Sequence, residues 1–375
     1  MDDGYDHMEE IGLSADRQVI SGCRGLLTPD DSIREICARY LRDGGRVFDM
    51  LSKYEELSSL YPEDGGGEGG GMMRTVVSLL RANGATDHGA YTFYKENLRL
   101  MPGADRAVHY LRGLEPFFIN TGSLEHHMMN VTESLGITMA GVNCSRASFD
   151  LIEIGKNDAK ELREFVSEVA KMDPNVISDL IEVGLKEDHK GWGLLERIDS
   201  MITERIPEME FFDGLSHVVS IGSNEKSYAL LEIRNQTEIN FDATVYVGSS
   251  PSDNNAMDII RDTGGLAVSF NGSAEAVWGS NVAVMSPDST VIAVLAAEFY
   301  DGGIESVFDL IGNWSADFIR KKEGPDRHLL KELIRVSGKR FPEVVAVNDD
   351  NREDIARRSE IYRKKVSESA RYRGV

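Results

Sequence analysis

Residues 19–28 read Val-Ile-Ser-Gly-Cys-Arg-Gly-Leu-Leu-Thr, a stretch typical of a β-strand that runs into a short loop. The apolar residues come first, and glycines at 22 and 25 punctuate the turn, which predicts that the strand ends there. In α/β sheets, ligands bind beyond the carboxyl ends of the strands, so this loop is a candidate site. The turn holds no carboxylate, hydroxyl or imidazole group, and its one strongly polar side chain is Arg24. This loop would therefore contribute the positive charge of Arg24 to a site, and no carboxylate or hydroxyl nucleophile.

The pattern of an apolar strand followed by a polar or glycine-rich loop recurs at three places along the chain. They are residues 116–120 before Thr121, residues 217–221 before the loop that ends at Lys226, and residues 243–247 before the loop that ends at Asp253. Apolar segments at 265–270 and 282–285 complete the predicted sheet. Helical patterns separate these strands at 125–135, 227–234 and 254–262. Strands that alternate with helices predict an α/β fold with a doubly wound parallel sheet.

Two mainly helical inserts interrupt the predicted sheet and suggest a division into domains. We expect an acidic lead at 1–16, a core at 17–28, 114–145 and 212–300, a helical cap at 29–113, a second helical insert at 146–211, and a helical C-terminal extension at 301–375.

Local signals refine this division. Ser32 and Glu35 have the spacing of a capping box, which predicts the start of the first cap helix. The glycine-rich loop 64–71 lacks the Gly-Lys-Ser/Thr ending of a phosphate loop, so we interpret it as a linker. The highly charged segment 352–373 is expected to form a solvated amphipathic helix.

The composition of the chain bears on which kinds of partner it could bind. The 375 residues include 63 Asp and Glu against 41 Lys and Arg, a net charge of -22, which disfavours nucleic acid and anionic lipid. The three cysteines form no CxxC pair, and residues 1–10 are acidic without an apolar signal segment, which indicates a reducing cytoplasm. The most apolar stretch, 282–299, contains Ser286, Asp288 and Glu298, so we expect no membrane span.

The four loops stand in the order found in the haloacid dehalogenase (HAD) superfamily, which the chain resembles. In that family one strand ends in Asp-x-Asp, a second in Ser or Thr, a third element supplies Lys, and a fourth loop reads Gly-Asp-x-x-x-Asp. The helical insert after the first loop is similar to the cap of phosphoserine-phosphatase-type members. Segments 48–54, 97–103 and 264–272 resemble the archaeal family labelled as energy-converting hydrogenase A subunit R, found in methanogens. The resemblance covers residues 17–300 and implies a HAD-like core.

Three departures from the family pattern bear on activity. Gly22 stands where the superfamily has its nucleophilic Asp, Arg24 where it has the general acid/base Asp, and Ser249 where it has a metal-binding Asp. Glycine has no side chain to attack with, and arginine, with a pKa above about 12, releases no proton near neutrality. Mg²⁺ prefers carboxylate oxygens, and Asp253 alone remains. We therefore expect no cofactor, with Mg²⁺ bound at Asp253 only if catalysis is retained.

The favoured hypothesis is a catalytically inactive HAD-fold protein, a pseudo-phosphatase. It would bind a protein partner or a phosphorylated small molecule without hydrolysis, and Arg24, Thr121 and Lys226 are the candidate anion ligands. A simpler interpretation is that Arg24 pairs with Asp253 or another acid and that the pocket is vestigial.

Two alternatives belong to other functional classes. An active phosphatase or hydrolase would need a relocated metal site, built from Asp253 with Asp30, Asp31 or Asp213. An accessory subunit of an archaeal redox complex is implied only by the family label.

Other side chains with reactive or metal-binding chemistry are interpreted as structural. Cys23 is expected to point away from the loop and pack on the sheet. The remaining candidates lack ligand spacing or look like core fillers: His126 and His127, the surface residue His189, and the pairs Met72-Met73 and Met128-Met129.

Overall fold

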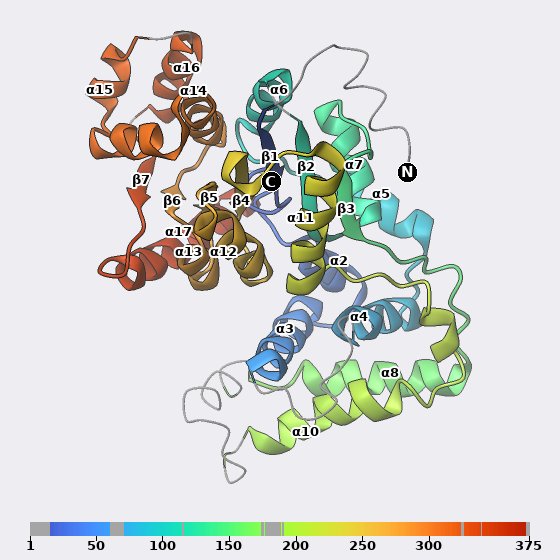
Figure 1. The fold of residues 1–375 in the computed structure, drawn as a ribbon. Coiled ribbons are helices and arrows are strands. Elements are labelled where there is room, and N and C mark those ends of the chain that lie inside the picture. The colour runs from blue at the N-terminus through green and yellow to red at the C-terminus, as the bar shows by residue number, and fades with distance from the viewer. Residues whose placement is uncertain are drawn as a thin grey trace.

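The computed structural model describes residues 16–60, 71–114, 116–173, 176, 189, 191–323, 326–338 and 340–372. Most of residues 1–16 and of the glycine-rich loop 64–71 lie outside these ranges. In the described part of the chain one sheet forms, in the spatial order β3-β2-β1-β4-β5-β6-β7 (Figure 1). Its strands are β1 (Gln18–Ser21), β2 (Phe117–Leu124), β3 (Val142–Ser145), β4 (Thr244–Gly248), β5 (Leu266–Phe270), β6 (Val282–Met285) and β7 (Glu343–Ala346).

The sheet is parallel except at one edge, where β7 pairs antiparallel with β6. Helices cover both of its faces. Successive strand residues point to opposite faces, so Val19 packs with α6 (Ala104–Leu114), α7 (Glu125–Leu135) and α14 (Thr290–Gly312). Its neighbour Ile20 packs with α11 (Ser223–Thr237), α12 (Asn254–Asp262) and α13 (Ala274–Gly279). The predicted doubly wound parallel sheet is confirmed.

The helices from the two inserts share one hydrophobic core, which reaches the sheet at Leu124, the last residue of β2 (Figure 1). Tyr54 donates a hydrogen bond to Asp199 at 2.5 Å, and Arg81 Nε donates to the carbonyl of Ile152 at 2.9 Å, so both inserts contribute to it. The helices concerned are α2 (Ser32–Tyr40), α3 (Gly44–Leu60), α4 (Gly71–Ala82), α5 (Asp87–Asn97), α8 (Lys156–Val169) and α10 (Trp192–Ser200). Between α14 and β7 come α15 (Ala316–Lys321) and α16 (Arg327–Ser337), and β7 is followed by α17 (Arg352–Tyr372).

Two strand predictions are corrected. Residues 217–221 are not a strand of the sheet, since only Val219 forms an isolated antiparallel bridge, with Arg146. The place beside β2 is taken by β3, whose alternate polar residues Asn143 and Ser145 hide the strand pattern. Neither β3 nor β7 was expected, and β2 continues past the predicted end at residue 120 to Leu124.

The start of α2 also differs from the expected capping box. Asp31, not Ser32, is the N-cap, and its carboxylate accepts hydrogen bonds from the backbone N–H groups of Ile33 and Arg34. Glu35 instead forms an ion pair with Arg99 at 2.7 Å, so it cannot reach back to the cap. Asp31 is the better cap because its carboxylate accepts hydrogen bonds from two backbone N–H groups at once.

The C-terminal helix α17 is not a solvated tail. Ile355, Ala356 and Ser359 are 1%, 3% and 1% exposed, and Ser359 donates a hydrogen bond to the carbonyl of Gly272 at 2.8 Å. Farther along the helix, Ser367 donates to the carbonyl of Pro29 at 3.2 Å. The helix therefore lies across the loops at the carboxyl ends of the strands.

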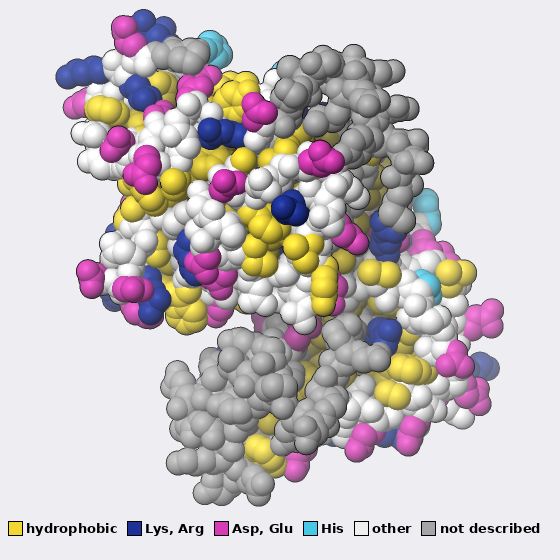
Figure 2. All heavy atoms as spheres, in the orientation of Figure 1, with side chains coloured by type: hydrophobic (Ala, Val, Ile, Leu, Met, Phe, Trp, Pro, Cys, Tyr) yellow, Lys and Arg dark blue, Asp and Glu magenta, His cyan; other side chains and the backbone are white. Residues whose placement is uncertain are grey.

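The charged side chains on the surface are mixed, and no basic patch that would suit nucleic acid is visible among the described residues on the face in Figure 2. On the described part of the face shown in Figure 2, Lys and Arg side chains are scattered among Asp and Glu and do not gather in a patch. Among the described helices, none is long and apolar enough to cross a bilayer.

Docking of α17 gives a first prediction. Ile355→Ala is expected to lower the free energy of unfolding by about 2–5 kcal/mol, because it removes a fully buried side chain. Ile361→Ala changes the same residue type on the same helix at a site that is 49% exposed, and should cost less than about 0.5 kcal/mol. Urea denaturation measures both values. Equal and small effects would mean that α17 does not dock in solution.

Candidate functional site

Loops from distant parts of the chain meet at the carboxyl ends of β1 and β4. A Cβ atom at Gly22 would lie 3.7 Å from Asp253 Oδ2, and Ser249 Oγ donates a hydrogen bond to the carbonyl of Arg24 at 2.9 Å. Lys226, from α11, places its Nζ 2.7 Å from Asp253 Oδ1. The structure thus brings together five of the six residues that the sequence singled out.

Thr121, the sixth, lies on the neighbouring strand β2. It is buried, and its Oγ1 accepts a hydrogen bond from the backbone N–H of Ser123 at 3.2 Å. The adjacent Asn120 links this strand to α11 by donating from Nδ2 to the carbonyl of Lys226 at 2.9 Å. The contacts of the Thr121 hydroxyl are therefore local.

Asp253 is the best-connected side chain of the site. Its Oδ1 accepts hydrogen bonds from Lys226 Nζ at 2.7 Å and from the Tyr246 hydroxyl at 3.0 Å. Its Oδ2 accepts from the backbone N–H groups of Ser249 and Ser250, both at 2.9 Å, and from the Ser250 hydroxyl at 2.7 Å. Protein donors thus occupy both carboxylate oxygens.

The pair of Lys226 and Asp253 is almost completely withdrawn from solvent, with side chains 3% and 2% exposed. Burial alone would raise the pKa of the Asp253 carboxyl. The charge of Lys226 and hydrogen bonds from Lys226 and Ser250 outweigh it, so the pKa lies below its ordinary value. Ser252 also accepts a hydrogen bond from Lys226 Nζ at 2.9 Å. The site therefore holds an internal, neutral ion pair.

Of the two glycines in the first loop, the backbone conformation requires glycine at only one, Gly25. Gly25 has φ of +92°, and a Cβ there would lie 3.0 Å from the carbonyl of Phe270, so the turn requires glycine. Gly22 does not have positive φ, and the nearest atoms to an added Cβ lie at ordinary contact distance. A side chain at position 22 would fit, and a carboxylate there would face Asp253.

Arg24 pairs with an acid from the start of α2. Its Nη1 lies 3.1 Å from Asp31 Oδ2, and both side chains are partly exposed. Asp31 is also the N-cap of α2, so one carboxylate joins the first loop to the cap helices. This matches the simpler sequence interpretation, in which Arg24 pairs with an acid.

The residues at this site do not fit a magnesium ion. Mg²⁺ needs several free oxygen ligands in octahedral geometry, whereas both oxygens of Asp253 already accept protein hydrogen bonds. Ser249 Oγ donates a hydrogen bond to the Arg24 carbonyl, so the hydroxyl is also engaged with the protein. Among the described residues, no group of three or more His, Cys, Asp or Glu is arranged to hold a metal.

The carboxylates considered for a relocated metal site have other contacts. Asp30 lies 2.6 Å from Arg99, and Asp31 is held by Arg24. Asp213 belongs to the short turn at 212–215, next to residues of the insert core.

The reactive side chains that the sequence interpreted as structural are mostly buried. Cys23 is 0% exposed, and burial raises the pKa of its thiol to about 12, so it packs in the core as expected. His127 packs against Tyr94, and burial lowers its pKa to about 4. His126 Nε2 lies 3.1 Å from Asp87 Oδ1. Met128 fills the core, but Met129 is 47% exposed, which corrects its assignment as a core residue.

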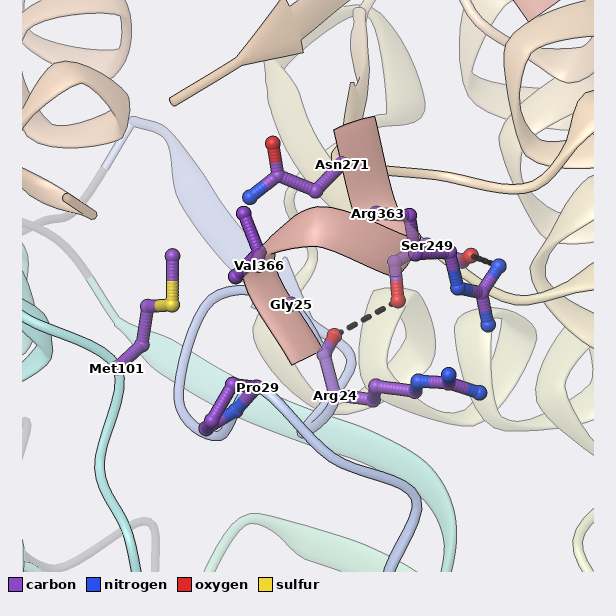
Figure 3. A pocket seen from close by; sticks show the side chains of 8 residues that line it. All are labelled: Arg24, Gly25, Pro29, Met101, Ser249, Asn271, Arg363 and Val366. Carbon is purple, nitrogen blue, oxygen red and sulfur yellow. Dashed lines mark hydrogen bonds between the residues drawn. The ribbon is translucent and has the colours of Figure 1, made fainter. Parts of the chain in front are cut away.

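Arg363 of α17 is a member of the site that the sequence analysis missed. Its Nη1 donates a hydrogen bond to the carbonyl of Ser249 at 2.8 Å (Figure 3). Together with Val366 it closes a cavity of about 10 Å³ against Arg24 and Gly25, room for one water molecule. The spacing of Ile355, Ser359, Arg363 and Val366 places them on one helix face, which was the available signal.

Comparison with known proteins supports the fold. No family model matches the sequence, and no curated protein sequence matches it. The structure of gene product AF1437 from Archaeoglobus fulgidus has a TM-score of 0.69 at 18% sequence identity, over 94% of this chain and 96% of that chain. A phospho-aspartyl intermediate analogue of phosphoserine phosphatase has a TM-score of 0.45 at 13% identity, over 74% of this chain and 97% of that chain. A HAD family hydrolase, t0658 from Salmonella enterica serovar Typhi, has 0.39 at 9% identity, over 72% and 71%.

The buried pair leads to a second prediction. Lys226→Met should lower the free energy of unfolding by about 3–5 kcal/mol, because it leaves the Asp253 charge buried and uncompensated. Lys160→Met removes the same charge from an ion pair with Glu164 in which the lysine is 76% exposed, and should cost less than about 1 kcal/mol. Urea denaturation at neutral pH compares them. A cost for Lys226→Met as small as that of the control would contradict the pairing.

The depressed pKa of Asp253 gives a prediction for acid. A carboxyl whose pKa is lower in the folded state stabilises the fold above its unfolded pKa, near about 3.9, and loses this contribution as the pH falls. The stability difference between wild type and Lys226→Met should therefore shrink below about pH 4. Unfolding followed from pH 7 to pH 3 measures this difference. A gap that stays constant would mean that Asp253 is not charged at neutral pH.

Proposed function

We propose that this chain is a catalytically silent protein with a HAD-type core, which binds a phosphate-like anion or a protein partner without hydrolysis. One observation carries the proposal: the carboxylate of Asp253 is fully occupied by donors of the protein itself. A carboxylate in this state is held in a structural role and has little capacity left for a metal ion.

The first loop supports the same conclusion. A HAD phosphatase attacks phosphorus with a carboxylate, and Gly22 offers none although a side chain would fit at its position. Arg24 stands where the proton would be exchanged, and a guanidinium stays charged at neutral pH. Phosphoryl transfer also depends on neutralisation of developing charge by a metal, for which the site lacks ligands.

The remaining groups favour anion binding over chemistry. Of the three proposed anion ligands, Thr121 is uncharged and Lys226 is paired with Asp253. Arg24 is the charge nearest to solvent among them, with a side chain 29% exposed. Its planar fork suits a phosphate group without help from a metal.

The alternatives have weaker support. An active hydrolase would need carboxylates that are now bound to arginine, Asp30 and Asp31. The narrower resemblance to the archaeal hydrogenase-subunit family, the role in a redox complex and a cytoplasmic location stay predictions, as do the boundaries of the core and cap.

A phosphatase assay tests the proposal. Wild-type protein with p-nitrophenyl phosphate and Mg²⁺ should release nitrophenol no faster than the Asp253→Ala variant, because neither has a nucleophile at position 22. The triple variant Gly22→Asp/Arg24→Asp/Ser249→Asp, checked for folding by circular dichroism, should gain metal-dependent turnover. Wild-type turnover that Asp253→Ala abolishes would overturn the proposal.

A further inference from the structure

A groove of about 470 Å³ lies near the β3 edge of the sheet, between the cap helix α5 and the core helix α7. Its third wall is the segment after β3, at Ala147 and Ser148. A volume of this size is within the range of sites for small organic ligands. The groove shares no lining residue with the loops that carry Gly22, Arg24 and Asp253, so it is a separate place on the protein.

The carboxylate of Asp87, the first residue of α5, joins the three walls. It accepts hydrogen bonds from the Ser148 hydroxyl at 2.5 Å and from the backbone N–H of Phe149 at 2.7 Å. The ring of His126, from α7, has its Nε2 atom 3.1 Å from the same carboxylate. Burial alone would raise the pKa of Asp87, but the hydrogen bonds from Ser148 and Phe149 outweigh it, so the pKa lies below its ordinary value. The protein itself therefore holds the walls together, and one of them is negatively charged.

A second carboxylate lines the groove, that of Glu125, which is half-buried. Among the described residues, none forms a hydrogen bond or an ion pair with it. Its position in the first turn of α7 favours the ionised form, because the N-terminus of a helix is partly positive. Arg146 lies in the same region, since both side chains act on the Cys144 thiol, but Arg146 is exposed and does not line the groove. Glu125 is thus a charge with which a cation could still pair.

The hydroxyl groups of the groove use their hydrogens within the protein. Ser148 donates to the carboxylate at the start of α5, and Tyr91 donates to Glu133 Oε2 at 3.2 Å, so both oxygens can only accept from a ligand. The His126 side chain is 9% exposed, and its Nδ1 atom has no hydrogen-bond partner among the described residues. None of the described residues that line the groove is Lys or Arg. These features favour a ligand that brings positive charge and hydrogen-bond donors.

Met129 gives the groove an apolar surface. Its side chain is 47% exposed, whereas that of its neighbour Met128 is buried. A methionine side chain is flexible and packs well against aliphatic and aromatic groups. The Lys95 ammonium already lies over the Tyr91 ring, 5.7 Å from its centroid, so the ring is engaged by a cation of the protein. An apolar part of a ligand is therefore best placed at Met129.

We propose that this groove binds a small primary amine that has an apolar body. The ammonium pairs with Glu125, and the apolar body lies against Met129. An ammonium has three donors and no acceptor, which suits a groove whose unused polar atoms include a free carboxylate and two hydroxyl oxygens that can only accept. The inference goes beyond the proposed function and does not depend on it, because the two places share no residue.

Isothermal titration with 2-phenylethylamine at pH 7, where an alkyl ammonium is charged, tests the site. Wild type should bind one amine. The compound 2-phenylethanol, which has the same body without the charge, should bind at least about tenfold more weakly, equal to about 1.4 kcal/mol. Glu125→Gln should weaken amine binding by at least the same factor. Glu96→Gln removes the same charge from an exposed position of α5 that does not line the groove, and should bind the amine as wild type does.

A second variant tests the apolar contact. Met129→Ala changes an exposed side chain, so it should unfold at the same urea concentration as wild type and still bind the amine more weakly. Unchanged affinity in Met129→Ala would overturn the placement of the apolar body. The inference as a whole is overturned if wild type does not bind the amine, binds the alcohol equally well, or binds no better than Glu125→Gln. An equal loss in Glu96→Gln would also overturn it, because the net charge of the chain would then account for the attraction.

Discussion

A buried ion pair between Lys226 and Asp253 holds together the loops where the strands of the sheet end. Lys226 arrives on α11, and Asp253 closes the loop after β4, so the pair joins segments 27 residues apart in the chain. The carboxylate also fixes the backbone of Ser249 and Ser250, and Ser249 in turn bonds to Arg24 of the first loop. These contacts occupy both oxygens of the Asp253 carboxylate and connect three loops of the site in one hydrogen-bond network.

This constraint explains how the other elements are placed around the site. Asp31 caps α2 and pairs with Arg24, so the first cap helix starts from the same loop that ends β1. From the opposite side, α17 brings Arg363 to the carbonyl of Ser249 and Ser367 to that of Pro29. The loops thus contact both the first cap helix and the C-terminal helix.

Most of the central strands and their loops could be predicted from the sequence, because the patterns that mark them are local. Each of the strands β1, β4, β5 and β6 is a short apolar run beside glycine or polar residues. The loops after β1 and β4 carry four of the predicted residues: Gly22, Arg24, Ser249 and Asp253. Prediction failed where the signal depends on tertiary contact. Polar residues in β3 mask its period, and residues 217–221 look like a strand but lie outside the sheet. The charges of α17 suggested a solvated helix, whereas its buried face is a narrow stripe that includes Ser359 and Arg363. No sequence pattern could show that the donors around Asp253 all come from the protein.

Thermal unfolding tests most directly whether the site is complete without a divalent metal, as we propose. The midpoint should be the same in EDTA and in about 10 mM MgCl₂, with NaCl matching the ionic strength, because a ligand that does not bind the folded state cannot stabilise it. The variant Gly22→Asp/Ser249→Asp, which restores two carboxylates beside Asp253, should instead be stabilised by Mg²⁺. A rise of several degrees for wild type in MgCl₂ but not in NaCl would contradict the account.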